Sequence, residues 1–151
     1  MQRWVSYENA MEDLEGRDPS QRLGALLVEY RSGGLSLSIE DLRKLFIYAW
    51  ADGAHAREFD QERSVLTLLR WIAPVRDAEI YLSGTHIIYR PVEGAENGIV
   101  WTLDEAVARA ASPNGIVQGE VESNEVLAHL TASGKNHVLA DPEDIGDVRP
   151  L

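Results

Sequence analysis

Apolar residues recur at helical spacing through the first half of the chain. The clearest run occupies positions i, i+3, i+4 and i+7, at Leu23, Leu26, Leu27 and Tyr30. This spacing places apolar side chains on one face of a helix. Asp18-Pro19 precedes the run and is typical of a helix start, because an acidic cap and a proline in the first turn both suit an N-terminus. The pattern predicts a helix that ends at Gly33-Gly34.

Three more helices are predicted in this half, over residues 1–16, from Ser38 to Gly53, and from about Glu58 to Pro74. The first would bury a face made of five residues: Trp4, Val5, Tyr7, Met11 and Leu14. Ser38 suits a helix cap, since its hydroxyl can accept a hydrogen bond from a free backbone N–H of the first turn. Pro74 ends the last helix, because proline has no N–H and restricts the residue before it.

After Pro74 the apolar residues alternate with polar ones instead. This period is typical of strands, and it predicts them at five places: 79–82, 85–90, 99–101, 116–122 and 137–140. Val148 could add an edge strand near the end of the chain.

Two short helices are predicted between these strands. Thr102 and Glu105 match the T-x-x-E capping box ahead of residues 105–111. Ser123 would cap the second, which would bury three residues: Val126, Leu127 and Leu130. The sequence therefore predicts an α+β protein, with a helical N-terminal half packed on a small, mostly antiparallel sheet with short helices.

The length of the chain favours one domain. A chain of 151 residues is long enough to bury a single sizeable core but not two. We expect one domain over residues 1–151, in which a helical half (1–74) and a mixed half (75–151) share that core. No apolar run approaches the length of a membrane span, and the N-terminus lacks the apolar segment of a signal peptide, so we expect a cytoplasmic protein with no membrane partner.

The charge of the chain limits its partners. The formal net charge is −11 at pH 7, which argues against binding nucleic acid through its phosphates, because phosphate contacts need Lys or Arg. One interpretation is a solubilising surface. The other is an interaction protein or inhibitor that presents carboxylates to a protein partner with a basic surface, such as an immunity or phage anti-defence factor. The oligomeric state stays open.

Several common chemistries lack their residues. The chain has no cysteine, which excludes disulfides, thiolate metal sites and a cysteine nucleophile. The four histidines are not spaced as ligands on one helix, so no metal site is predicted. No nucleophile elbow and no glycine-rich phosphate loop of either common form is present.

Three segments of the second half resemble the ADP-ribosyltransferase-like proteins, in particular bacterial and phage members of that group. They are Tyr89-Arg90 at a strand end, residues 98–104 followed by helix 105–111, and residues 126–142. The order of these segments is that of the family, and they cover about half of the chain. The resemblance implies that Arg90, Tyr89 and Thr102 bind NAD or ADP-ribose, with Arg90 anchoring a phosphate or ribose and Thr102 shaping the nicotinamide side. Arg90 could instead form a surface ion pair with Glu93 or Glu96.

The chain departs from the family where its active members carry a catalytic glutamate. The aligned triplet here is Lys135-Asn136-His137, and a cation at this place would oppose the positive charge that develops on the ribose. His137 could still hydrogen-bond to a ribose hydroxyl. Glu120 and Glu122 lie on one face of a predicted strand and could supply the missing acid, or could simply face solvent.

These residues leave three functions open. The first is a catalytically degenerate ADP-ribosyltransferase-like domain that requires no cofactor and binds a nucleotide, NAD or ADP-ribose among them, or a protein partner. The second is the acidic protein-interaction protein. The third is an active NAD-dependent transferase, so the sequence leaves open whether the protein is an enzyme.

Overall fold

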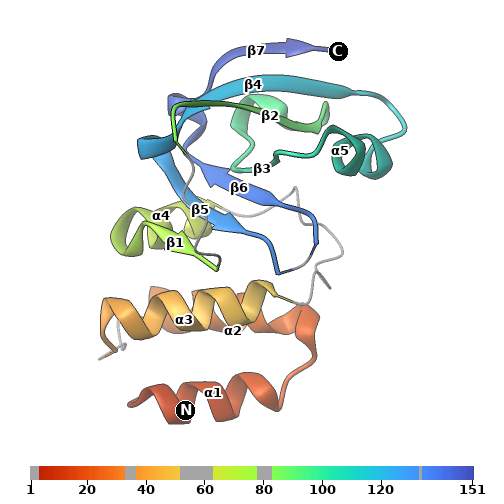
Figure 1. The fold of residues 1–151 in the computed structure, drawn as a ribbon. Helices are drawn as coiled ribbons and strands as arrows, with labels where there is room; N and C mark the ends of the chain where they lie inside the picture. Colours follow the sequence, from red (N-terminus) through yellow and green to blue (C-terminus); the bar gives the residue numbers. More distant parts are fainter. Residues whose placement is uncertain (1–3, 33–36, 52–62, 78–82, 133) are drawn as a thin grey trace.

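The computed structural model describes residues 4–32, 37–51, 63–77, 83–132 and 134–151. Within these residues the chain forms helices first and then a seven-stranded sheet, as Figure 1 shows. The four helices of the N-terminal half are α1 (Tyr7–Glu15), α2 (Pro19–Arg31), α3 (Ile39–Trp50) and α4 (Arg63–Ile72). The predicted α+β class, with its helical N-terminal half, is confirmed.

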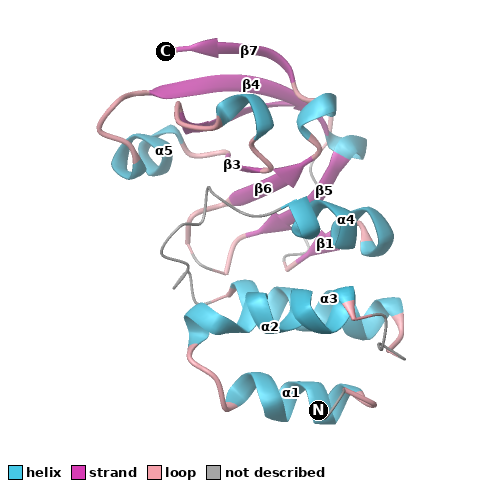
Figure 2. Cartoon of the chain, turned by 180° about the vertical axis from the view of Figure 1, so that it is seen from behind, coloured by secondary structure: helices cyan, strands magenta, loops and turns pink. Residues whose placement is uncertain are grey.

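The sheet and a fifth helix occupy the second half of the chain. The strands are β1 (Val75–Arg76), β2 (Thr85–Pro91), β3 (Val100–Thr102), β4 (Ile116–Glu122), β5 (Val126–Leu130), β6 (His137–Ala140) and β7 (Gly146–Pro150). Helix α5 (Glu105–Ala111) packs against β2 and β3. The strand order is β1-β5-β6-β3-β2-β4-β7, and only β1 and β5 pair in parallel. In Figures 1 and 2 the β1 edge lies near the helices and β7 lies at the far end.

The helix starts follow from local side chains. The Ser38 hydroxyl accepts a hydrogen bond from the backbone N–H of Asp41, as its sequence position predicts. Ser6 caps α1 in the same way, through the N–H of Asn9. Val5 precedes this helix and is 72% exposed, so its predicted place on the buried face is wrong. Asp18 stands at the cap position of α2 without a side-chain cap bond, and Pro19 fills the first helical position.

Two predictions for the second half are also wrong. Residues 126–130 form strand β5, not a helix, after a short 3-10 turn at Ser123–Glu125. A central strand covered on both faces needs apolar residues at nearly every position, and a short run of this kind has no period that separates it from a helix. Thr102 does not cap α5 either. Asp104 is its cap, and its carboxylate accepts from the N–H of Ala106 at 3.0 Å.

Other predicted strands agree with the structure. Strands at 85–90, 99–101, 116–122 and 137–140 correspond to β2, β3, β4 and β6, and Val148 lies in the edge strand β7. The predicted strand at 79–82 and the predicted helix ends at Gly33-Gly34, Gly53 and Glu58 lie outside the described residues.

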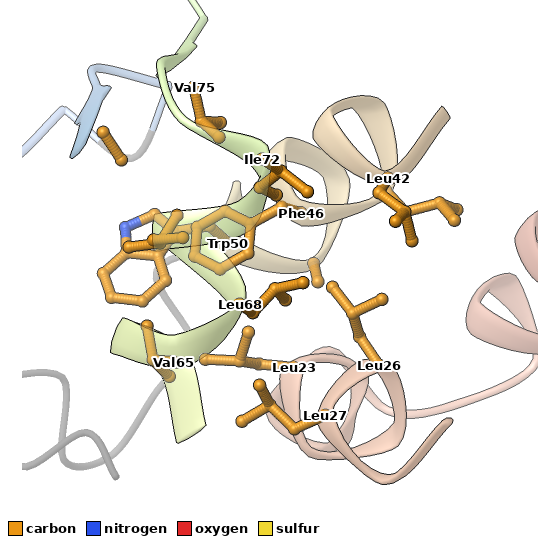
Figure 3. Packing of buried hydrophobic residues seen from close by; sticks show 14 of the residues in the cluster. Leu23, Leu26, Leu27, Leu42, Phe46, Trp50, Val65, Leu68, Ile72 and Val75 are labelled. Carbon is orange, nitrogen blue, oxygen red and sulfur yellow. The ribbon is translucent and has the colours of Figure 1, made fainter. Parts of the chain in front are cut away.

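One buried cluster joins the helices to the sheet. It includes Leu26, Phe46 and Leu68 from the helices and Val100 and Leu139 from the central strands. Figure 3 shows the helical part of this cluster, with Phe46 and Trp50 close to each other and side chains of α2 and α4 around them. Their rings stack with centroids 5.9 Å apart. The two halves of the chain therefore share a core.

Polar ties hold the helices to each other and to the sheet. The guanidinium of Arg43 on α3 donates to the backbone carbonyls of Ile72 (2.5 Å) and Ala73 (3.2 Å), at the C-terminal end of α4. Arg70 on α4 forms an ion pair with Asp141, which follows β6. Burial by itself would raise the pKa of Asp141, but the backbone N–H of Glu143 and the Arg70 guanidinium together outweigh it and lower that pKa.

The sheet has two sides with different coverings. The first side carries Val100 and Leu139 and packs on the helices. The second side carries a smaller buried cluster: Ile88, Trp101, Val117, Val121, Val126, Val138 and Ala140. No helix of the described residues is long and apolar enough to cross a membrane.

Candidate functional site

Strand register brings three of the predicted site residues into one row. Tyr89 on β2 pairs with Thr102 on β3, and Thr102 pairs with His137 on β6. Directly opposite residues in a sheet point to the same side. All three side chains therefore stand on the first side of the sheet, although they come from segments far apart in the sequence.

Arg90 stands on the second side of the sheet. It follows Tyr89 directly, and successive side chains of a strand point to opposite sides. Its guanidinium lies over the ring of Trp101, 5.8 Å from the centroid, and its side chain is 1% exposed. The sheet itself thus separates Arg90 from Thr102 and His137, so these residues do not line one groove.

The Arg90 guanidinium hydrogen-bonds to backbone carbonyls within and at both ends of the loop that joins β2 to β3. It donates to the carbonyls of Glu93 (3.1 Å), Val100 (3.3 Å) and Pro91 (3.4 Å). The loop backbone lies so close that a Cβ added at Gly98 would lie 1.7 Å from a guanidinium nitrogen. This arrangement fixes the loop between β2 and β3 on a buried cation. At 1% exposure Arg90 is not at the surface, so the surface ion pair considered from the sequence is wrong.

Glu93 in the same loop serves the neighbouring turn. Its carboxylate accepts from the amide of Asn114 (2.6 Å) and the hydroxyl of Ser112 (3.1 Å). The hydrogen bond from Asn114 is the main reason why the pKa of Glu93 is lowered, and the positive charge of Arg90 contributes less. Arg90 and Glu93 together therefore order the loops at one end of β2 and β4.

The hydroxyl of Thr102 is used within the chain. It donates to the carbonyl of Lys135 at 2.7 Å and accepts from the backbone N–H of Asp104 at 3.1 Å. The side chain is completely buried. These bonds tie the start of the α5 segment to the turn before β6, which explains why a threonine stands at this place.

His137 forms the centre of a contact between the sheet and α3. The indole N–H of Trp50 donates to Nδ1 of His137 at 3.0 Å, and the two rings meet edge to face with centroids 5.4 Å apart. Both side chains are at most 1% exposed. Because an indole N–H can only donate, Nδ1 must be the acceptor in this arrangement, and the ring proton belongs on Nε2.

Glu120 and Glu122 lie on the open part of the first side. They pair with Ile87 and Thr85 on β2. We define the outer β2/β4 face as the six residues of these strands that point this way and are not fully buried: Thr85, Ile87, Tyr89, Gln118, Glu120 and Glu122. Ile87 is 46% exposed, and the Thr85 hydroxyl donates to the Glu122 carboxylate at 2.6 Å. Of the three residues that stand in one row across β2, β3 and β6, namely Tyr89, Thr102 and His137, only Tyr89 also belongs to the outer β2/β4 face.

Some residues that organise the second half were missed by sequence reasoning. Asp77 accepts hydrogen bonds from the backbone N–H groups of Thr131 (2.8 Å) and Ala132 (2.7 Å) and from the Thr131 hydroxyl. No local pattern predicts this contact, because the partners are more than fifty positions apart. The cap role of Asp104 was predictable, since an aspartate directly before a helical run is a common N-cap.

The described residues offer no group of three His, Asp or Glu side chains that could hold a metal ion. Comparisons of the chain with protein-family models, curated proteins and solved structures found no match. The resemblance to ADP-ribosyltransferase-like proteins therefore stays a prediction from sequence motifs. The chain forms an α+β protein with a mixed seven-stranded sheet, on which β2 and β4 carry the partly exposed Glu120 and the exposed Glu122.

Proposed function

We propose that this chain acts as a protein-interaction protein, which contacts a partner with a basic surface through the outer β2/β4 face. The observation that carries the proposal is the contrast between two sets of polar groups. Arg90, Thr102 and His137 are buried and hydrogen-bonded within the chain, so they have little left to offer a ligand. Glu120 and Glu122 stand on an open sheet face.

The charge of this face is consistent with the net charge of the whole chain. Its six residues include two carboxylates and no Lys or Arg. By register, the exposed Arg149 of β7 lies opposite Gln118 and stands on the same side of the sheet, so one cation borders this face. Complementary charge of this kind speeds encounter with a basic partner and discriminates against acidic ones, and its effect weakens as salt rises.

Affinity capture from a lysate of the source organism tests the proposal when it is combined with matched variants. The double variant Glu120→Gln/Glu122→Gln removes two charges from the outer β2/β4 face. Glu8→Gln/Glu12→Gln removes the same two charges from exposed positions on α1. We expect a salt-sensitive partner that the first variant loses and the second retains. Equal retention, or equal loss, in the two variants would contradict the proposal.

A nucleotide-binding role gives a different result. A ligand present at 100 times its dissociation constant stabilises a protein by about 2.7 kcal/mol, which is a clear rise in melting temperature. Because Arg90 and Thr102 already hydrogen-bond within the chain, we expect no shift with NAD or ADP-ribose at millimolar concentration. A shift that Arg90→Lys abolishes would favour nucleotide binding instead.

A further inference from the structure

Two asparagines of the chain are followed directly by glycine, and the two pairs lie in different surroundings. Asn97-Gly98 and Asn114-Gly115 both continue as Ile-Val. Glycine has no side chain to shield its backbone nitrogen or to restrict rotation of the peptide unit before it. This nitrogen can therefore attack the side-chain amide carbon of the preceding asparagine. Both pairs have the chemistry for this reaction, and the fold decides which of them can react.

The peptide unit between Asn97 and Gly98 is held in place. The N–H of Gly98 donates to the carbonyl of Ala95 at 3.3 Å, and Gly98 is buried. A Cβ added at Gly98 would lie 1.7 Å from a nitrogen of the Arg90 guanidinium, which is itself buried and hydrogen-bonded to this loop. Rotation of the peptide unit would displace this cation, so Asn97 is protected although it is exposed.

The peptide unit between Asn114 and Gly115 has more freedom. Within the described residues, neither the carbonyl of Asn114 nor the N–H of Gly115 forms a hydrogen bond. A Cβ added at Gly115 would meet nothing within 4 Å, and Asn114 is exposed. The Asn114 side-chain amide donates to Oε1 of Glu93 at 2.6 Å. This hydrogen bond joins two exposed residues, so it opens more readily than the buried contacts behind Gly98.

We propose that Asn114 is a modification site, at which the chain converts its own asparagine to aspartate and isoaspartate without an enzyme. The nitrogen of Gly115 bonds to Cγ of Asn114, and the bond from Cγ to Nδ2 breaks. The amide nitrogen leaves as ammonia and takes the proton of the Gly115 N–H. Water then opens the cyclic imide: addition at Cγ gives aspartate, and addition at the backbone carbonyl carbon gives isoaspartate. No oxidant or reductant takes part.

The modification alters a contact that joins two loops. The Glu93 carboxylate accepts from the Asn114 amide and from the Ser112 hydroxyl. In the product a carboxylate faces Glu93 where a donor stood, and two like charges at this distance repel each other. The hydrogen bond from Asn114 is the main cause of the lowered pKa of Glu93, so this pKa rises in the product. The turn then separates from the loop after β2, where the Val92 N–H donates to the Gly115 carbonyl at 3.1 Å.

Ageing of the intact chain at mildly alkaline pH tests the site. Trypsin places the two asparagines in separate peptides, 77–109 and 110–135, and fragmentation in a mass spectrometer measures the loss of the amide at each position. In the folded protein we expect Asn114 to react about tenfold faster than Asn97, which corresponds to a difference of about 1.4 kcal/mol between the two barriers. In urea the two should react at similar rates, because both pairs are followed by the same residues.

Variants test the structural consequence. Asn114→Asp carries one product from the start and should speed hydrogen exchange of the Val92 amide about fivefold, which corresponds to about 1 kcal/mol. Asn97→Asp adds the same charge at an exposed position and should leave this exchange unchanged. Equal rates at the two asparagines in the folded protein, faster reaction at Asn97, or no reaction at Asn114 would overturn the assignment of the site. Unchanged exchange at Val92 in Asn114→Asp would overturn the release of the turn.

Discussion

Replacing Trp50 by phenylalanine tests how strongly α3 is coupled to the sheet. The substitution removes the indole N–H that donates to His137 Nδ1 at 3.0 Å, in a place where both side chains are at most 1% exposed. A buried acceptor left without its donor costs about 1–3 kcal/mol. The reverse substitution, His137→Leu, leaves the indole N–H without its acceptor and should cost a similar amount.

The double variant is the informative one. With both partners gone, neither the donor nor the acceptor of this hydrogen bond is left unpaired, so the double variant should be more stable than the sum of the single losses predicts, by about 1–2 kcal/mol. For a chain of 151 residues each kcal/mol corresponds to a change of about 2–4 °C in melting temperature. Each single variant should therefore melt about 2–12 °C lower than the parent protein, with the double variant close to the lower of the two.

Urea unfolding followed by far-UV circular dichroism measures the free energies, since the variants alter tryptophan fluorescence. Trp101→Phe serves as the control, because its indole N–H donates to the carbonyl of Gly98 and its side chain stands on the second side of the sheet. It should be additive with His137→Leu. If Trp50→Phe and His137→Leu are also additive within about 0.5 kcal/mol, the hydrogen bond does not couple the two halves and the reasoning is refuted.

Three further predictions concern single residues. Gly98→Ala should destabilise the protein by about 3 kcal/mol or more, because the new Cβ would overlap the Arg90 guanidinium. Gly24→Ala, at an exposed position of α2, meets nothing within 4 Å and should stabilise the protein by about 0.5–1 kcal/mol. The two urea midpoints should therefore move in opposite directions. Asp141→Asn should flatten the loss of stability in acid. A carboxyl group with a lowered pKa stabilises the fold above its unfolded pKa of about 3.9, and this stabilisation is lost as the pH falls through its folded pKa. An unchanged slope of urea midpoint against pH between about 5 and 2 would show that Asp141 is not responsible. Asp104→Ala should cost about 1 kcal/mol through the lost cap of α5, and an unaltered melting temperature would show that the cap contributes nothing.

The sequence predicted the elements whose signal is local. Leu23, Leu26 and Leu27 show the period of α2, and all three are buried. Ser38 has the chemistry of a cap and acts as one. In β4 the alternation of Val117 and Val121 with polar residues correctly separates a buried side from an open one.

The failures come from contacts between distant segments. Residues 126–130 become a strand because β1 and β6 pair with them on both edges, and nothing within the five residues states this. Arg90 looks like a ligand anchor in the sequence, since strand ends often present polar groups. Its burial depends on the loop backbone of Gly94 and Gly98 closing over the guanidinium, which only the folded chain reveals.

The candidate site was predictable in part. That Glu120 and Glu122 share one side of a strand follows from their spacing alone. That Tyr89, Thr102 and His137 stand in one row follows from a register that no single segment encodes. The side of the sheet on which Arg90 stands was open to prediction, because it is adjacent to Tyr89 and adjacent strand residues diverge.

The last strand also affects how molecules of this protein meet each other. An unpaired edge invites a neighbouring chain to extend the sheet, and many copies joined in this way make a fibre. Strand β7 resists such growth: its pairing with β4 shifts register between Gln118 and Glu120, Asp147 has a φ of 51°, and Pro150 contributes no N–H. The last strand of the chain thereby discourages polymerisation at this edge of the sheet.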